Sequence, residues 1–214
     1  MTHINDGGDL YGALEPLNLL EKKPPMWWPG YGGFEVLVGA ILTQNTQWPK
    51  VEHSLQNLRE HAFLTPEAIA ELDLGILMEL IAPSGLYKTK AKYLKNFCQS
   101  LLETYGDFES FCFETDREWL LAQKGVGAET ADSMLCYGCG RAAMVVDAYT
   151  ARLVASLGYE FESYDELQAW CMSGLAGSDE ELAKTYAWLH GMIVEYVKRH
   201  KKGKGVDTAP LGLS

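Results

Sequence analysis

The chain has 214 residues, of which 47% are hydrophobic and 22% charged, so it can form one large domain or two small lobes with real cores. This composition argues against disorder except at the ends. A net charge of −11 weighs against binding a polyanion through bulk charge, and basic clusters at residues 88–95 and 198–204 resemble solvated helix faces.

Nothing in the sequence indicates secretion or a membrane. The first ten residues lack the basic and apolar regions of a signal peptide. No apolar run approaches the roughly 20 residues that a membrane span needs. The five cysteines are an odd number, which favours reduced thiols. We therefore expect a cytoplasmic protein with no membrane partner.

Apolar residues recur at three- and four-residue spacing, the period of amphipathic helices. Thr65 precedes a proline at a first helical position, and Ser163 followed by Glu166 indicates a capping box. Residues 203–214 lack periodicity and predict a loose tail. The chain is therefore predicted to be all-α, with helices at about 33–45, 50–62, 66–82, 88–105, 115–123, 128–140, 147–157, 163–175 and 179–200.

The stretch 120–152 carries the most chemical information. A short helix ends at Lys124, and the tight turn Gly125–Gly127 precedes a helix that starts at Ala128. The two glycines permit positive φ and close approach of a ligand, while the apolar residue between them anchors the turn in the core. The next helix N-terminus offers backbone N–H groups that suit a phosphate. Glycines also end ordinary helices, so this pattern alone is weak.

About twenty residues later, the apolar run 144–146 leads to Asp147 at the start of another helix. An aspartate in that position is most simply a helix cap. Its residue type and position alone therefore do not make it catalytic.

Four segments, in this order, resemble the endonuclease III superfamily of DNA glycosylases, the helix-hairpin-helix-GPD proteins. They are the early helix and polar loop Gly39–Thr46, the segment Ser84–Ala91, the hairpin 125–127 with Thr130–Ala131, and Val146–Asp147. Together they span about residues 30–160, and chance does not readily produce four matches in one order. The resemblance implies that Asp147 is the catalytic aspartate.

The resemblance also implies two helical lobes. Residues 33–143 would form the lobe with the hairpin, and residues 1–32 and 144–214 a second, discontinuous lobe. Asp147 is then expected in the cleft between them, where it would stabilise positive charge on the sugar and activate water.

Contacts to double-stranded DNA follow from the same resemblance. Gln44 and Leu86 occupy the family's wedge positions, although Leu86 as a core leucine and Gln44 as a helix cap are alternatives. The residues implied in DNA binding are Gln44, Leu86, Lys124, Gly125, Val126 and Gly127.

Two departures from the family pattern narrow the function. Bifunctional members carry a lysine two residues after the second hairpin glycine, and its amine attacks C1′ of the sugar. Glu129 stands there, and a carboxylate cannot form a Schiff base. Many members also hold an iron–sulfur cluster on four C-terminal cysteines, whereas no cysteine follows Cys171. We therefore expect neither AP lyase activity nor a cofactor.

A metal site at Cys136 and Cys139 is the remaining alternative. These cysteines have no second pair of ligands at suitable spacing, and they lie within a predicted helix. We interpret them as structural thiols and expect no bound metal.

Two tryptophans indicate the substrate. Trp28 and Trp48 lie on either side of the first family helix, where core packing is the plainer role. The whole chain, however, resembles bacterial 3-methyladenine DNA glycosylases of the endonuclease III type, which implies that both rings stack on a flipped base. A cationic base between two rings gains about 0.5–2 kcal/mol. We therefore expect a monomeric glycosylase for alkylated purines.

Two other functions remain open at this point. A glycosylase for oxidised or mismatched pyrimidines would use the same fold and the same Asp147. A catalytically inactive DNA-binding module would use the hairpin alone. The retained aspartate argues against the second of these.

Overall fold

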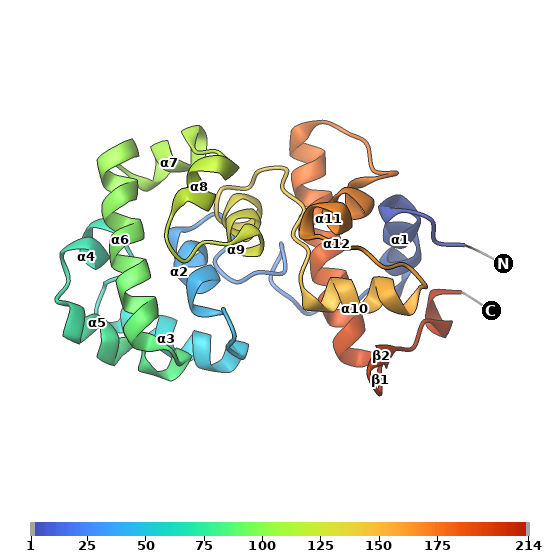
Figure 1. Ribbon diagram of the computed structural model, residues 1–214, viewed down its shortest axis with the longest axis horizontal. Coiled ribbons are helices and arrows are strands. Elements are labelled where there is room, and N and C mark those ends of the chain that lie inside the picture. Colours follow the sequence, from blue (N-terminus) through green and yellow to red (C-terminus); the bar gives the residue numbers. More distant parts are fainter. Residues whose placement is uncertain (1–2, 213–214) are drawn as a thin grey trace. The chain divides into compact units, whose positions relative to one another are not determined.

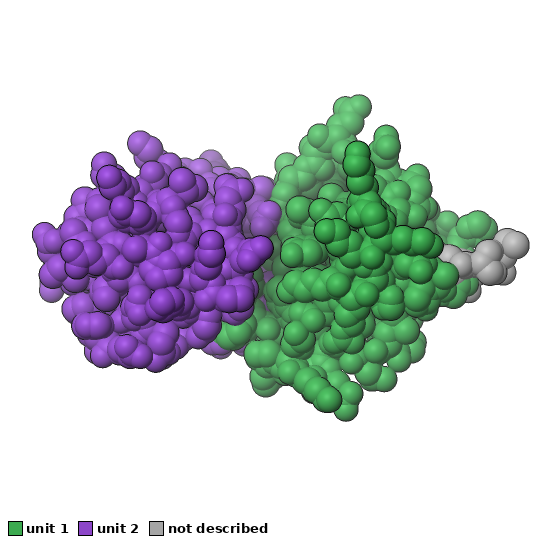
Figure 2. Space-filling view, turned by 90° about the horizontal axis from the view of Figure 1, so that it is seen from below, with its two compact units in different colours: residues 1–29, 140–214 green, residues 30–139 purple. Residues whose placement is uncertain are grey.

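The computed structural model describes residues 3–212, and most of the regular structure in this range is helical (Figure 1). The predicted all-α class is confirmed. The chain divides into two compact units, coloured separately in Figure 2. Unit 1 contains the described residues up to Pro29 and from Gly140 onward, and unit 2 is Gly30–Cys139. Within the described range, no helix has the length and apolar character of a membrane span.

Unit 2 is organised around α6 (Tyr87–Tyr105), whose apolar face buries Leu94, Phe97 and Leu101. Helices α2, α4, α5 and α7 pack against α6. The other elements of the unit are α2 (Phe34–Leu42), α3 (Trp48–Glu60), α4 (Pro66–Glu71), α5 (Leu74–Leu80), the 3-10 turn η2 (Ala82–Ser84), α7 (Phe108–Glu114), α8 (Arg117–Ala122), α9 (Ala128–Ser133) and the π-helical turn η3 (Met134–Gly138).

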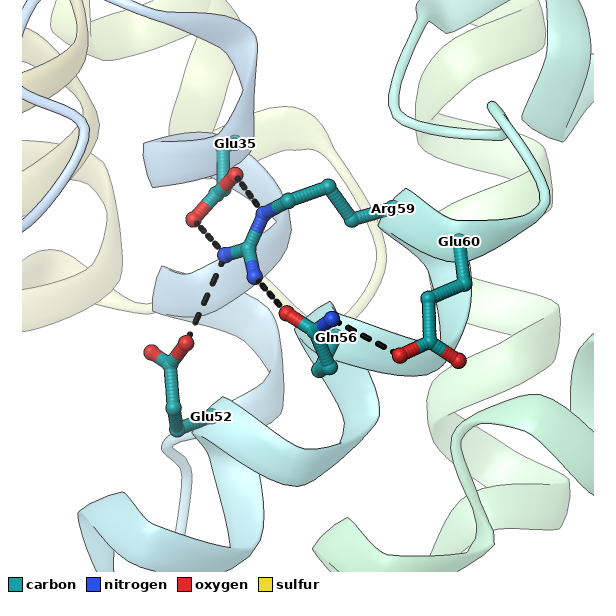
Figure 3. Close-up of polar contacts among 5 residues, drawn as sticks. All are labelled: Glu35, Glu52, Gln56, Arg59 and Glu60. Atoms are coloured by element: carbon teal, nitrogen blue, oxygen red, sulfur yellow. Dashed lines mark hydrogen bonds and ion pairs between the residues drawn. The ribbon is translucent and has the colours of Figure 1, made fainter.

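A surface network joins α3 to α2 (Figure 3). Arg59 donates from Nη2 to Glu35 Oε1 at 2.7 Å and from Nε to Glu35 Oε2 at 3.3 Å. The hydrogen bond to Glu35 is the main reason that the pKa of Arg59 is raised. The same guanidinium contacts Glu52 and Gln56. These bonds fix the two helices that flank the loop at residues 43–47, which carries Gln44.

In unit 1, described residues from the N-terminal and C-terminal segments share one apolar core with α12 (Asp179–Arg199). Helix α1 (Gly7–Leu14) packs on α11 (Tyr164–Met172) and α12, and α10 (Ala148–Ser156) packs on α12. Gly7 permits the approach of α1 to α11, because a Cβ there would lie 1.8 Å from the carbonyl oxygen of Cys171. The remaining elements are η1 (Glu15–Leu17), β1 (Lys201–Lys202), β2 (Gly205–Val206) and η4 (Ala209–Leu211).

The predicted loose tail is wrong for its described part. Lys201 pairs with Val206 and Lys202 with Gly205 in a short antiparallel hairpin. Val206 is buried and donates its N–H to Ser156 Oγ on α10 at 3.0 Å. Leu211 is buried as well. These elements are too short for their apolar residues to form a periodic pattern, so the sequence does not reveal them.

Other predicted helix boundaries also change. The helix predicted over 66–82 is broken, because Asp73 Oδ1 accepts from the backbone N–H groups of Gly75 and Ile76 and starts α5. Helices α1 and α7, each of about two turns, lie outside the predicted helices.

The cap predictions have mixed outcomes. Thr65 caps α4 as predicted, by accepting from the N–H of Ala68 at 3.1 Å. Ser163 caps α11, but Glu166 accepts from the N–H of Glu162, so the predicted capping box is incomplete. The complete capping box lies at Ser178 and Glu181, at the start of α12.

Candidate active site

The apolar run before Asp147 is buried in unit 1 and held by α11. Gln168 Nε2 donates to the carbonyl of Met144 at 2.6 Å, and the N–H of Val146 donates to the hydroxyl of Tyr164 at 3.4 Å. Met144 and Val146 belong to the apolar core of the unit. This extended segment therefore delivers Asp147 to a fixed position at the N-cap of α10.

The two carboxylate oxygens of Asp147 have different partners. Oδ1 accepts from the backbone N–H of Thr150 at 2.8 Å and from its hydroxyl at 3.0 Å. Oδ2 lies 3.5 Å from His190 Nε2, and 13% of the Asp147 side chain is exposed. Burial alone would raise the pKa of Asp147, but the adjacent imidazole of His190 and the bonds from Thr150 outweigh it. The pKa is thus lowered, and the carboxylate is ionised at neutral pH.

His190 is a site residue that the sequence did not reveal. It lies on α12, its side chain is only 4% exposed, and its ring meets Trp27 edge to face at 5.2 Å between centroids. Trp27 donates from Nε1 to Glu195 at 3.2 Å. A histidine within a long regular helix matches no catalytic spacing, so only the fold brings it to Asp147.

Charged side chains surround the buried Glu195. Lys23 lies 2.8 Å from Glu195 Oε2, and Lys198 lies 3.6 Å from Oε1. The ammonium of Lys198 also lies 5.8 Å from the ring centre of Tyr149, two residues after Asp147. Lys198 therefore links Glu195 to the first turn of α10, the helix that Asp147 caps.

The hairpin of unit 2 uses its two glycines differently. Gly125 has a φ of +90°, and a Cβ there would lie 2.2 Å from the ring of Tyr93. Gly127 has a φ of −96°, and a Cβ added there would meet nothing within 4 Å. Val126 between them is buried, which confirms the predicted anchor. One glycine therefore shapes the turn, and the other leaves its outer face open.

Gln44 contacts this hairpin rather than capping a helix. Its Nε2 donates to the carbonyl of Gly125 at 2.8 Å and to the hydroxyl of Thr130 at 3.1 Å. The C-cap of α2 is Thr43, so the alternative of a helix cap is wrong. Two predicted DNA-binding segments are thereby joined within unit 2.

Lys90 ties together the loops around Gln44 and Leu86. Its Nζ donates to the carbonyl of Leu42 at 2.7 Å, to the hydroxyl of Thr46 at 2.8 Å and to the carbonyl of Ser84 at 2.9 Å. The residue is 2% exposed, and burial lowers its pKa to about 8. The sequence predicts this lysine only as part of a basic cluster.

Leu86 is not a core leucine. It is 66% exposed and has a φ of +48°, in the left-handed region that residues with a Cβ rarely adopt. It stands directly before α6, beside the 3-10 turn that Lys90 holds. An exposed apolar side chain on strained backbone is a feature that often accompanies function.

The other predicted site residues are divided between the two units. Trp28 is buried in unit 1 and meets Trp27 edge to face, while Trp48 is half-buried at the start of α3 in unit 2. Lys124 is exposed in the hairpin, and Glu129 is exposed in the first turn of α9. The assignment of both tryptophans to a base pocket stays a prediction.

The cysteines do not form a recognisable metal site. Cys136 is buried, Cys139 is half-buried, and neither forms a disulfide. Within residues 3–212, no group of three or more histidine, cysteine, aspartate or glutamate side chains is arranged to hold a metal ion. The donor set therefore does not fit an iron–sulfur cluster, which needs four cysteine ligands.

Several known proteins are similar to this chain in sequence and in fold. The model of the HhH-GPD superfamily of base excision DNA repair proteins matches residues 38–174. A Methanocaldococcus jannaschii protein that bears the name of a DNA repair glycosylase is 41% identical over 194 residues, 86% of each chain. Endonuclease III of Thermotoga maritima is 32% identical over 166 residues, 78% of this chain and 73% of its own.

One solved structure is similar over nearly the whole chain. The H. pylori 3-methyladenine DNA glycosylase, crystallised with 1,N6-ethenoadenine, superposes with a TM-score of 0.86 and 40% sequence identity. The alignment covers 91% of this chain and 98% of the H. pylori chain.

Proposed function

Since the chain belongs to the HhH-GPD superfamily of base excision DNA repair proteins, we propose that this DNA glycosylase removes alkylated purines such as 3-methyladenine by hydrolysis alone. The observation that carries the choice of substrate is the 40% identity to the H. pylori 3-methyladenine glycosylase over 91% of the chain. The ionised Asp147 supports the chemistry, because a carboxylate is what the cleavage of a glycosidic bond requires.

The proposed reaction begins with a flipped base, because the glycosidic bond is inaccessible inside the duplex. As the bond breaks, positive charge develops on the sugar, and the negative charge of Asp147 stabilises it. The same carboxylate then orients and activates the attacking water. A purine methylated at N3 already carries positive charge, so it leaves without protonation by the enzyme.

The proposed DNA contacts rely on backbone rather than on many basic side chains. The turn Gly125–Gly127 and the N-terminus of α9 present N–H groups to a phosphate, and Lys124 adds one positive charge. Gln44 and Leu86 are proposed to fill the gap that the flipped base leaves. This use of backbone N–H groups reconciles DNA binding with a net charge of −11.

Trp28 and Trp48 are proposed as the ring faces on which the flipped base stacks. A ring face attracts a cation through its quadrupole, so stacking would favour a cationic purine over a neutral lesion. The half-buried position of Trp48 at the start of α3 supports a face that a ligand reaches.

The absence of lyase chemistry is supported by Glu129, which occupies the position of the family's nucleophilic lysine. Reaction with damaged DNA should leave intact abasic sites that break only after alkali or heat. Borohydride should trap no covalent adduct between protein and DNA. A trapped adduct would contradict the proposal and show that another amine has taken the place of the lysine.

Base release from a panel of lesions tests the proposed substrate. Duplexes carrying 3-methyladenine, an oxidised pyrimidine or a mismatched thymine are incubated with the protein, and released bases are quantified. Preferential release of 3-methyladenine supports the proposal. Preferential release of a pyrimidine would replace it with a pyrimidine glycosylase, and no release from any duplex would indicate a DNA-binding module.

A further inference from the structure

The reaction that we propose has only one oxygen of Asp147 available to it. A carboxylate oxygen offers two lone pairs, and Oδ1 already accepts two hydrogen bonds from Thr150. These bonds belong to the first turn of α10, so breaking them would uncap the helix. Chemistry at the sugar therefore falls to Oδ2, which faces His190 Nε2 at 3.5 Å.

The ring of His190 is held in one orientation by its surroundings. Trp27 covers it edge to face with the two ring planes at 82°, and Trp27 is itself hydrogen-bonded to Glu195, five residues further along α12. Gly191 makes this packing possible, because a Cβ there would lie 2.6 Å from Trp27. Trp27 also adopts a φ of +66°, which costs free energy that the packing must offset.

We propose that His190 is a positioning residue: the Nε2–H group of His190 directs Oδ2 of Asp147 toward the reacting sugar. This inference rests on the proposed function. The distance of 3.5 Å exceeds that of an ordinary N–H···O bond. Contacts of this kind commonly shorten when the substrate binds. A donor at Oδ2 also favours the charged carboxylate, whereas burial favours the neutral acid.

Other titratable groups lie on the elements packed around Asp147. Cys171 on α11 stays a neutral thiol, because burial and the charge of Asp147 raise its pKa to about 12. Glu195 and Lys198 on α12 pair with each other, and Tyr149 follows Asp147 on α10. Of all the groups that lower the pKa of Asp147 against burial, His190 has the largest effect.

Two substitutions separate positioning from packing. His190→Leu keeps much of the buried volume but has no donor. His190→Gln places an amide Nε2 about as far along the side chain as the imidazole Nε2, so it keeps the donor without a titratable ring. His200→Leu is the matched control, because His200 lies at the end of the same helix and stacks on Tyr196.

The readouts are melting temperature, affinity for a duplex with an abasic-site analogue, and the single-turnover rate of 3-methyladenine release from acid to neutral pH. We expect His190→Leu to slow release on the order of tenfold to a hundredfold, the value of a hydrogen bond to a charged group, with DNA affinity unchanged. We expect His190→Gln to recover most of the rate and His200→Leu to match the unaltered protein.

The pH dependence gives a readout that packing alone would not move. The pKa of Asp147 is lowered in the folded protein, so the active carboxylate is lost only as the pH falls through that depressed value. Without His190, burial is opposed only by Thr150, and the pKa rises. The acid limb of the rate profile should therefore move toward neutral pH in His190→Leu and less in His190→Gln.

The outcomes also distinguish this inference from the proposed function. Equal losses in both His190 variants, or losses that only track melting temperature, would overturn the positioning role. So would an acid limb that stays in place. If Asp147→Asn retains its activity, the proposed catalytic residue is wrong, whereas an inactive Asp147→Asn beside a fully active His190→Leu refutes the positioning role alone.

Discussion

The carboxylate of unit 1 and the hairpin of unit 2 are held by opposite kinds of contact. In unit 1, contacts converge on one side chain, Asp147, whose Oδ2 faces His190. In unit 2, side chains hold backbone: Gln44 bonds the carbonyl of Gly125, and Lys90 bonds two other carbonyls. Unit 1 thus fixes the carboxylate that we propose to react, and unit 2 fixes the backbone of the hairpin and its neighbouring loops.

This difference predicts a division of effects between the two units. Substitutions around the carboxylate should change the rate of base release, because they alter the charge that stabilises the transition state. Substitutions around the hairpin should change stability and DNA affinity with little effect on the rate in the bound complex. Variants of Asp147, Lys90 and the hairpin glycines test the two sides of that division, and variants of Trp48 test a residue of unit 2 that is proposed to contact the base.

The largest effect is expected for Asp147→Asn. The amide keeps the shape of the side chain but has no charge to stabilise the developing cation, so release should fall by roughly a thousandfold or more. Affinity for damaged DNA should stay the same or increase. Single-turnover release and DNA binding are measured together, and a rate within about tenfold of the unaltered protein would contradict the assignment.

Asp107→Asn is the matched control for capping. Asp107 caps α7 in unit 2, where its Oδ1 accepts from the N–H of Ser110 at 2.7 Å. Its substitution makes the same chemical change at another helix cap, where an amide oxygen can still accept the bond and no reactive neighbour is present. We expect unchanged base release, which would show that the loss in Asp147→Asn does not come from exchanging one capping residue for another.

The second effect concerns Lys90→Met in unit 2. The thioether fills similar space but leaves the carbonyls of Leu42 and Ser84 and the hydroxyl of Thr46 without this donor. We expect the free energy of unfolding to fall by about 3 kcal/mol. Denaturant unfolding measures the loss, and Lys92→Met, at an exposed position of the same helix, should show almost none.

DNA affinity sharpens the Lys90 prediction. The two loops that Lys90 joins carry Gln44 and Leu86, so affinity should fall while the release rate at saturating protein stays nearly constant. A Lys90→Met protein that binds normally but releases base slowly would break the proposed division between the units.

Trp48 belongs to unit 2 but is proposed to contact the base, so Trp48→Ala should change the rate of release although it lies outside unit 1. Stacking contributes about 1–3 kcal/mol per base, so release of 3-methyladenine should fall roughly ten- to a hundredfold. Release of a neutral lesion should fall much less. Trp48→Phe should keep much of the activity, since a ring face remains.

Melting temperature separates this proposal from core packing. If Trp48 only packs, Trp48→Ala would lower the melting temperature sharply and slow every substrate equally. Rates on charged and neutral lesions are therefore compared beside the stability of each variant.

The elements that the sequence predicted are those whose signals are local. Long periodic helices such as α6 and α12 were found, and Thr65 marked the start of α4. The hairpin turn and its buried Val126 also follow from neighbouring residues. Such features depend on backbone conformation and on residues a few positions apart.

The contacts that organise the site join distant positions and leave no local signal. Gln44 and Gly125 are 81 residues apart, and Lys90 and Thr46 are 44 apart. His190 approaches Asp147 only because α12 packs on α10. A single sequence shows Lys90 as one of several lysines and His190 as one helical residue, so neither role was predictable without the fold.

The smallest effects are expected for the two hairpin glycines, which should fail in different ways. Gly125→Ala forces a Cβ toward the ring of Tyr93 at a φ of +90°, so it should cost about 1–2 kcal/mol of stability and weaken DNA binding through a distorted turn.

Gly127 has a φ of −96°, and the Cβ of Gly127→Ala meets nothing within 4 Å, so the melting temperature of this variant should change little. Its Cβ nevertheless stands where a phosphate would approach, and affinity should fall about threefold to tenfold. Thermal melts and binding to an abasic-site duplex measure both variants; unchanged affinity in Gly127→Ala would show that no phosphate approaches the hairpin there, and the division between the units would lose its main support.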